Sequence, residues 1–97
     1  MAFSIVLMPD AEIDLMEIYD WYEVKSKGLG ERFINLLDNR LNLLSKTPTI
    51  CPIRYESIRC SLIPDFPYLI HYEPDLNTER IIVYRGFHTS RKPLWEE

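Results

Sequence analysis

The hydrophobic period of this chain changes once along its length, and that change is the strongest constraint on its fold. In the first half, apolar residues recur every three or four positions, which is the spacing of one buried helical face. The two stripes consist of Ala11, Leu15, Ile18, Tyr19 and Tyr22, and then of Leu29, Phe33, Leu36, Leu37, Leu41 and Leu44. Gly28 separates the stripes, and Pro48 follows the second one. The pattern predicts helices over about 11–27 and 29–46 that form an antiparallel hairpin.

The remaining segments have the composition and alternation of strands. Residues 3–8 are rich in Ile and Val and are followed by Pro9, which suits the first turn of the next helix. Three later runs, over about 56–62, 68–73 and 79–87, are separated by short segments rich in Pro, Asp and Asn, as in an antiparallel meander. The last run is apolar on both alternating faces, which favours a central position in the sheet.

The predicted order of elements is β-α-α-β-β-β. We expect a single α+β domain over residues 1–97, in which the helical hairpin packs on a small, mostly antiparallel four-stranded sheet. Tyr68, Ile70 and Tyr72 share one face of their strand, and we expect them in the core with Val83. His71 would point the other way, either as a catalytic base near a phosphate or as a polar residue at a half-wet sheet position.

Composition excludes several classes of protein. The 97 residues include 11 Lys and Arg against 15 Asp and Glu, a formal net charge of −4, which is the wrong sign for binding nucleic acid with the whole surface. Cys51 and Cys60 are too few for a disulfide framework or a zinc site, which favours a cytoplasmic setting. The first apolar run is too short for a signal peptide or a membrane span. Phosphate-loop, dinucleotide and hydrolase motifs are absent, so neither a cofactor nor a metal is expected.

Charge is unevenly distributed along the chain. Six acids lie between Asp10 and Glu23, either as a solvated face or as a surface for a basic partner. The basic residues and histidines of the second half are Arg54, Arg59, His71, Arg80, Arg85, His88, Arg91 and Lys92. The sheet and the tail are therefore predicted to be locally basic. His88 would serve either in RNA cleavage, as acid or base beside a phosphate clamp, or in fixing the path of the tail. Trp95, in that tail, would either dock back on the sheet or stack on nucleic acid.

Four pieces of the chain together suggest a family. They are Pro9-x-Ala11-x-x-x-Leu15-x-x-Ile18, Pro48 after the second helix, Phe66-Pro67-Tyr68-x-Ile70-x-Tyr72, and Arg91-x-Pro93-x-Trp95. In this order they resemble the RelE/ParE superfamily of bacterial toxins over nearly the whole chain. The resemblance implies the toxin of a type II toxin–antitoxin system, of the kind associated with plasmid stabilization. It also implies a hetero-oligomer, because the antitoxin of such a system wraps the helical hairpin and the sheet and keeps the toxin inactive.

The superfamily divides by target, and the residues of this chain favour one branch. RelE-like members are ribosome-dependent mRNA endonucleases with basic residues on the sheet, whereas ParE-like members share the fold and poison DNA gyrase. After Tyr68, where the nuclease branch has an arginine, this chain has Leu69. Ser61 stands at the position of a strand lysine, and Thr89 at that of another catalytic arginine. We therefore expect a ParE-like toxin with DNA gyrase as its target.

The candidate residues for binding the target or the antitoxin are Arg59, Arg85, His88, Arg91, Lys92 and Trp95. In the alternative of an endonuclease, His88, Arg59, Arg85 and Arg91 would be catalytic, and the partners would be the ribosome and mRNA. A third hypothesis is a degenerate toxin fold that serves only as an antitoxin-binding module. An acidic antitoxin segment would suit the basic sheet and tail.

Overall fold

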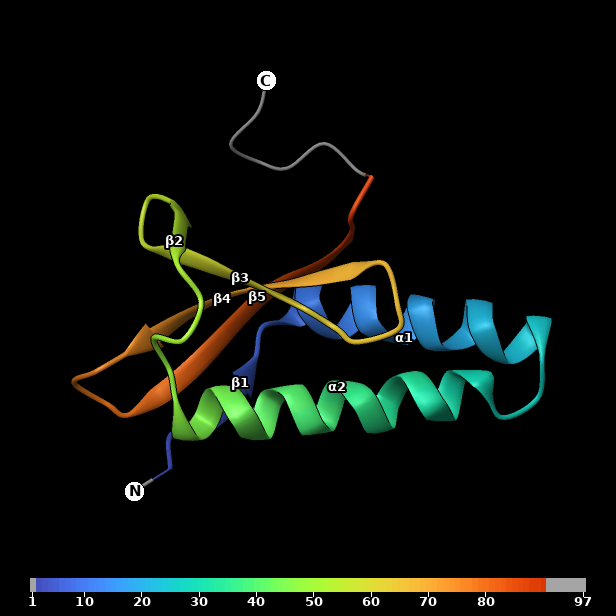
Figure 1. The fold of residues 1–97 in the computed structure, drawn as a ribbon, viewed down its shortest axis with the longest axis horizontal. Coiled ribbons are helices and arrows are strands. Elements are labelled where there is room, and N and C mark those ends of the chain that lie inside the picture. Colours follow the sequence, from blue (N-terminus) through green and yellow to red (C-terminus); the bar gives the residue numbers. More distant parts are fainter. Residues whose placement is uncertain (1, 91–97) are drawn as a thin grey trace.

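The structure is a computed structural model that describes residues 2–90, and it contains two helices and five strands over that range. In chain order the elements are β1 (Ser4–Leu7), α1 (Pro9–Lys25), α2 (Leu29–Lys46), β2 (Ile53–Tyr55), β3 (Ile58–Leu62), β4 (Tyr68–Asp75) and β5 (Arg80–His88). The two helices lie side by side on one face of the sheet (Figure 1). The predicted α+β architecture and the predicted order of the long elements are therefore confirmed.

The sheet has five strands in the order β1-β5-β4-β3-β2 rather than the four that were expected. Strand β1 pairs with β5 in parallel, and the other neighbours are antiparallel. The additional strand, β2, is three residues long and pairs irregularly with β3 through Ile53 opposite Arg59 and Tyr55 opposite Ile58. So short a strand shows no period of its own, which is why the sequence pattern did not predict it.

The helical hairpin closes through a single side chain of α1. The Glu23 carboxylate accepts hydrogen bonds from the backbone N–H groups of Gly28, Gly30 and Glu31, at 3.0, 3.0 and 3.3 Å. The hydrogen bond from Gly28 contributes most to a lowered pKa of Glu23, and those from Gly30 and Glu31 act in the same direction. The three bonds also satisfy N–H groups that the first turn of α2 leaves without a partner in the helix. Helix α1 ends at Lys25 rather than near Gly28, because Ser26 is already extended. Within the described residues, neither helix combines the length and the apolarity needed to cross a membrane.

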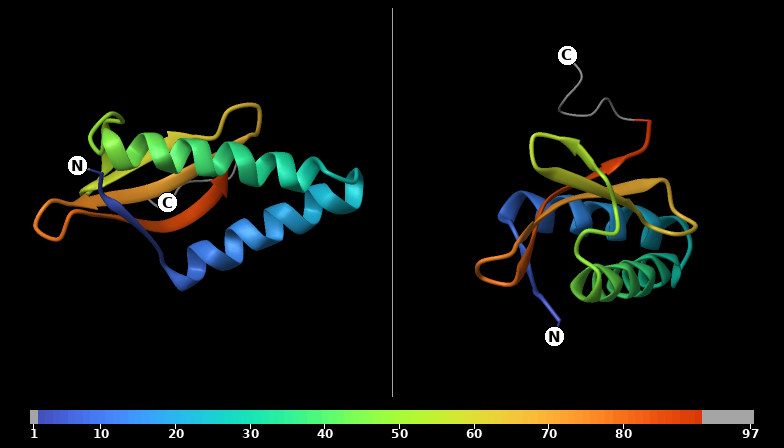
Figure 2. Two further views of the ribbon diagram at one scale, coloured as in Figure 1. Left: turned by 90° about the horizontal axis from the view of Figure 1, so that it is seen from below. Right: turned by 60° about the vertical axis from the view of Figure 1, so that its left-hand side comes forward.

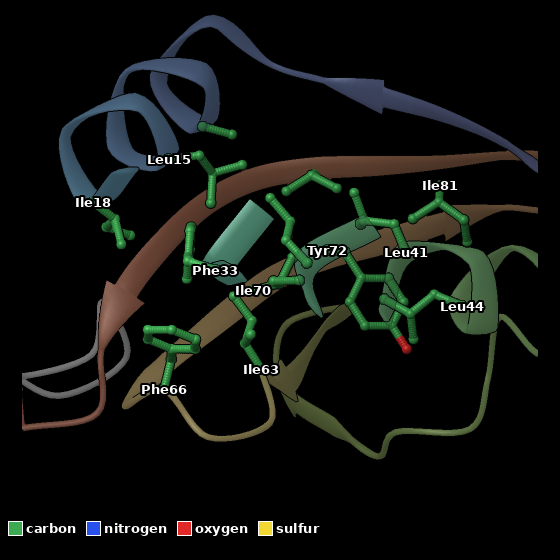
Figure 3. Close-up of a cluster of buried hydrophobic side chains, with 13 residues drawn as sticks. Leu15, Ile18, Phe33, Leu41, Leu44, Ile63, Phe66, Ile70, Tyr72 and Ile81 are labelled. Carbon is green, nitrogen blue, oxygen red and sulfur yellow. The ribbon is translucent and has the colours of Figure 1, made fainter. Parts of the chain in front are cut away.

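The core lies between the hairpin and the sheet (Figure 3). Its helical side chains are Leu15, Ile18, Phe33, Leu37, Leu41 and Leu44. On the sheet, Ile70, Tyr72 and Val83 are fully buried, as predicted, while Tyr68 is partly buried against the same cluster. The Tyr72 hydroxyl donates to the carbonyl of Pro48 at 3.0 Å, so the largest buried side chain also satisfies its polar atom.

An irregularity in β5 changes the direction of the side chains near its end. His71 pairs with Arg85 while Tyr72 pairs with Val83, so Tyr84 is an extra residue in the ladder. After this bulge Gly86 faces the helices, and a Cβ at that position would lie 3.2 Å from Cδ2 of Leu15. Helix α1 therefore approaches the end of β5 closely, which determines the position of the groups described next.

Candidate functional site

Arg59, a predicted site residue, is bound to the backbone on the helix-facing side of β3. It pairs with Tyr72 across the ladder, and its guanidinium donates to the carbonyls of Cys51 at 2.5 Å and Thr49 at 3.4 Å. These bonds hold the segment between α2 and β2. Arg59 thus has a structural partner in the described part of the chain and lies on the opposite face of the sheet from His71.

Arg85 is held by the only acid in the buried stripe of α1. Its Nε and Nη2 donate to the two oxygens of Asp14 at 2.7 and 3.1 Å, and the backbone N–H of Gly86 donates to Asp14 at 3.0 Å. The hydrogen bond to Asp14 raises the pKa of Arg85. The sequence offered a signal for this pair, because Asp14 is one residue before Leu15 and three after Ala11, within a stripe that is otherwise apolar.

His88 lies at the end of β5, beside Tyr68, with 5.1 Å between the two ring centroids. Its Nδ1 accepts a hydrogen bond from the backbone N–H of Ser90 at 3.0 Å. The other three predicted site residues, Arg91, Lys92 and Trp95, lie outside the described residues. The structure therefore brings Arg85 and His88 to one end of β5 but on different faces of the sheet: Arg85 pairs with His71, whereas His88 pairs with Tyr68 on the helix-facing side that also carries Arg59.

His71 is buried, so the expected half-wet position is wrong. The His71 side chain points away from the helices, as predicted, but only 1% of the residue is exposed. Its Nδ1 lies 3.1 Å from the Tyr55 hydroxyl and 3.7 Å from Sγ of Cys60, and its ring packs against Phe87 at 5.0 Å. Burial, with a smaller contribution from Arg85, lowers the pKa of His71 from 6.5 to about 4, and burial raises that of the Cys60 thiol to about 11. Near neutral pH both groups are neutral, as structural residues are.

The lowered pKa of His71 predicts a dependence of stability on pH. In the unfolded chain His71 takes up a proton near pH 6.5, but in the folded protein only near pH 4. The contribution of neutral His71 to the free energy of unfolding is therefore complete above pH 6.5 and is lost as the pH falls towards 4. Between pH 7 and pH 5 the free energy of unfolding should decrease by about 2 kcal/mol. Urea titrations at pH 7, 6 and 5 measure it. A His71→Gln variant should be less stable at pH 7 but should lack this slope; an equal slope in both proteins contradicts the assignment.

The sheet face that carries His71 has a cavity whose charged groups are acidic. It measures about 440 Å³ and is lined by Tyr55, Glu56, Ser57, Ile58, Glu73 and Tyr84. Glu73 accepts hydrogen bonds from the hydroxyls of Ser57 at 2.6 Å and Tyr84 at 3.1 Å. None of these lining residues carries a positive charge, so this cavity disfavours a phosphate group.

A second cavity of about 440 Å³ is an apolar groove between the two helices. The helices meet at Gly28 and diverge towards β1 (Figure 2). We call this cavity the hairpin groove; its lining residues are Leu7, Glu12, Leu15, Met16, Tyr19, Ile34, Leu37, Asp38 and Leu41. Met16 is 60% exposed. Sequence reasoning missed the groove, although Met16 and Ile34 signalled it as apolar residues outside the buried stripes.

Metal chemistry has no obvious place in the described residues. No group of three or more His, Cys, Asp or Glu side chains among them is placed to hold a metal ion. The arrangement offers apolar and acidic surfaces, together with polar groups that are mostly bonded to one another. Exposed apolar surface of this kind is typical of protein–protein contacts.

Two solved structures of toxin–antitoxin systems share this fold. One is described as the chromosomal ParDE system of P. aeruginosa, with a TM-score of 0.75, 16% identity, and coverage of 92% of this chain and 98% of that chain. The other is the RelBE2 toxin–antitoxin complex of Mycobacterium tuberculosis, with a TM-score of 0.66, 15% identity, and coverage of 91% and 99%. No curated protein sequence matches the chain.

The family follows from the sequence itself. A family model described as the ParE toxin of the type II toxin–antitoxin system parDE matches residues 5–93. Because the match spans most of the 97 residues, the chain belongs to the ParE toxin family. The predicted resemblance to the RelE/ParE superfamily is confirmed.

Proposed function

We propose that this protein is a toxin that acts by binding DNA gyrase rather than by cleaving mRNA. The observation that supports binding is the cavity on the His71 face of the sheet, whose charged lining residues are both acidic. There, Glu56 and Glu73 line the cavity, while Arg85 is paired with Asp14. A scissile phosphate needs unpaired cations at hydrogen-bond distance, so carboxylates at this position oppose phosphoryl chemistry.

We further propose that a cognate antitoxin neutralises the toxin by placing an amphipathic helix in the hairpin groove. The exposed Met16 and the partly buried Leu7 and Ile34 offer the apolar surface that such a helix buries. The charged residues that line the groove, Glu12 and Asp38, are both acidic and both exposed. A helix seated here would therefore place Lys or Arg beside its apolar stripe. The acidic segment suggested by the sequence would instead suit Arg91 and Lys92, outside the described residues.

The test is to express the protein without an antitoxin in bacterial cells. Growth should stop, with induction of the DNA damage response and accumulation of cleaved gyrase–DNA complexes, while translation at first continues. The Arg91→Ala, Lys92→Ala double variant should lose at most about 1 kcal/mol of folding stability but should be less toxic. His88→Ala should lose only affinity as a gyrase binder, whereas an endonuclease using this imidazole would lose about 10²–10⁴ in cleavage rate.

Primer extension on a reporter mRNA provides the contrary outcome. Cleavage inside codons that requires translating ribosomes would contradict the gyrase proposal and support an endonuclease. If the protein neither stops growth nor inhibits DNA supercoiling by gyrase, yet binds its antitoxin, it is a degenerate toxin fold. If the double variant is as toxic as the parent at equal expression, Arg91 and Lys92 are not part of the functional surface.

A further inference from the structure

A third cavity lies on the opposite flank of α1 from the hairpin groove. It measures about 300 Å³, and the lining residues that matter here are Asp14, Glu17, Trp21, Tyr68, Gly86 and His88. We call it the β5-edge pocket. Three aromatic rings, those of Trp21, Tyr68 and His88, contribute to its walls, and the other side chains named are acids. None of the six residues is basic at neutral pH apart from the weak base His88.

The pocket exists because, within residues 2–90, the second half of β5 has no neighbouring strand on that side. Strand β1 pairs with β5 only as far as Val83, and beyond that point α1 lies next to the edge. The Gly86 N–H on this edge is bonded to Asp14. In an antiparallel ladder the N–H and the C=O of one residue point to the same side, so the Gly86 carbonyl also points towards the pocket.

The two carboxylates of the pocket are in different electrostatic states. Asp14 is neutralised by its double hydrogen bond to Arg85. Glu17 is exposed and has no ion-pair or hydrogen-bond partner within residues 2–90. The pocket therefore holds one uncompensated negative charge beside a backbone acceptor and aromatic walls, and a cation is the complementary ligand.

Trp21, in the wall of the pocket, already contacts one cation of the same chain, the ammonium of Lys25. Its side chain is large and apolar, yet the residue is 58% exposed. The ammonium of Lys25 lies 4.2 Å from the centre of its ring, which is within cation–π distance.

We propose that the β5-edge pocket receives an arginine side chain of a protein partner. A guanidinium is planar, so it stacks on an indole or phenol ring while its N–H groups donate to coplanar acceptors. Here those acceptors are the Glu17 carboxylate and the Gly86 carbonyl. Lysine presents a compact, strongly hydrated charge and fits this combination less well. The pocket and the hairpin groove lie on opposite flanks of α1, so one antitoxin helix in the groove leaves the pocket open.

The experiment uses the full chain, made by cell-free synthesis with ¹⁵N label so that toxicity does not limit yield. The probe is the blocked peptide acetyl-Ala-Ala-Arg-Ala-Ala-amide, and the matched control is the same peptide with citrulline, which keeps the shape of arginine without its charge. We expect saturable shifts of the Trp21 indole N–H and the Gly86 amide, with at least about tenfold tighter binding of the arginine peptide. Equal binding of the two peptides, or no shift at Trp21, overturns the proposal.

Two charge-matched variants separate a specific pocket from general attraction to an acidic helix. Glu17→Gln should weaken the arginine peptide about fivefold, whereas Asp20→Asn, an exposed acid of α1 that does not line the pocket, should change it by less than about 1.5-fold. Equal weakening by both variants also overturns the proposal. The peptide titration does not depend on gyrase, so a failure of the gyrase proposal in cells and a failure of this pocket give distinguishable results.

Discussion

Replacing Asp14 by Ala should lower the free energy of unfolding by about 3–5 kcal/mol, the range for breaking a buried ion pair on one side. The change removes the acceptor for three donors at once: two guanidinium nitrogens of Arg85 and the N–H of Gly86. Only 9% of the Asp14 side chain and 29% of the Arg85 side chain are exposed, so water replaces these bonds poorly. Urea unfolding at pH 7 measures the loss.

Two further variants make this result specific. Asp14→Asn keeps an oxygen for the Gly86 N–H but loses the charge, so it should be intermediate between the parent and Asp14→Ala. Asp20→Ala removes an exposed acid from the same helix and should change stability by less than about 0.5 kcal/mol. A loss below about 1 kcal/mol for Asp14→Ala would mean that Arg85 and Gly86 find other partners in the variant.

Replacing Ile70 by Ala should cost about 2–5 kcal/mol, as large-to-small substitutions in a core do. Ile70 is fully buried between the sheet and both helices, where neighbouring side chains are packed from several directions and cannot all move into the cavity. The matched control is Leu62→Ala on the adjacent strand, because Leu62 is 50% exposed and should cost less than about 1 kcal/mol. Similar losses at both positions would contradict the observed strand face.

The hypothesis of a basic sheet changes in the light of the structure. Arg59 and Arg85 do lie on strands, as expected, but each donates to groups of the same chain. The charged residues that line the three cavities are acids such as Glu17, Glu56 and Asp38 instead. Charge along a sequence is additive, whereas charge on a surface depends on which pairs the fold brings together.

Local pattern alone was sufficient for the main elements. The stripe from Leu29 to Leu44 predicted a helix over 29–46, and α2 has those bounds. The alternation around Ile70 and Tyr72 predicted which face packs against the helices. These features follow from interactions within a few residues, namely helical or strand periodicity and the breaks at Gly28 and Pro48.

Other features were decided only by the tertiary structure, because they depend on residues far apart in the chain. Strand β2 exists because β3 offers it an edge, and His71 is buried because Tyr55, Cys60 and Phe87 converge on it. The sequence by itself determined the helices, the long strands and the apolar core, through periodicity. Three further features required the packed fold: the bulge at Tyr84, the pairing of Asp14 with Arg85, and the cavities on the two flanks of α1. Each combines groups whose distance in space no local pattern encodes.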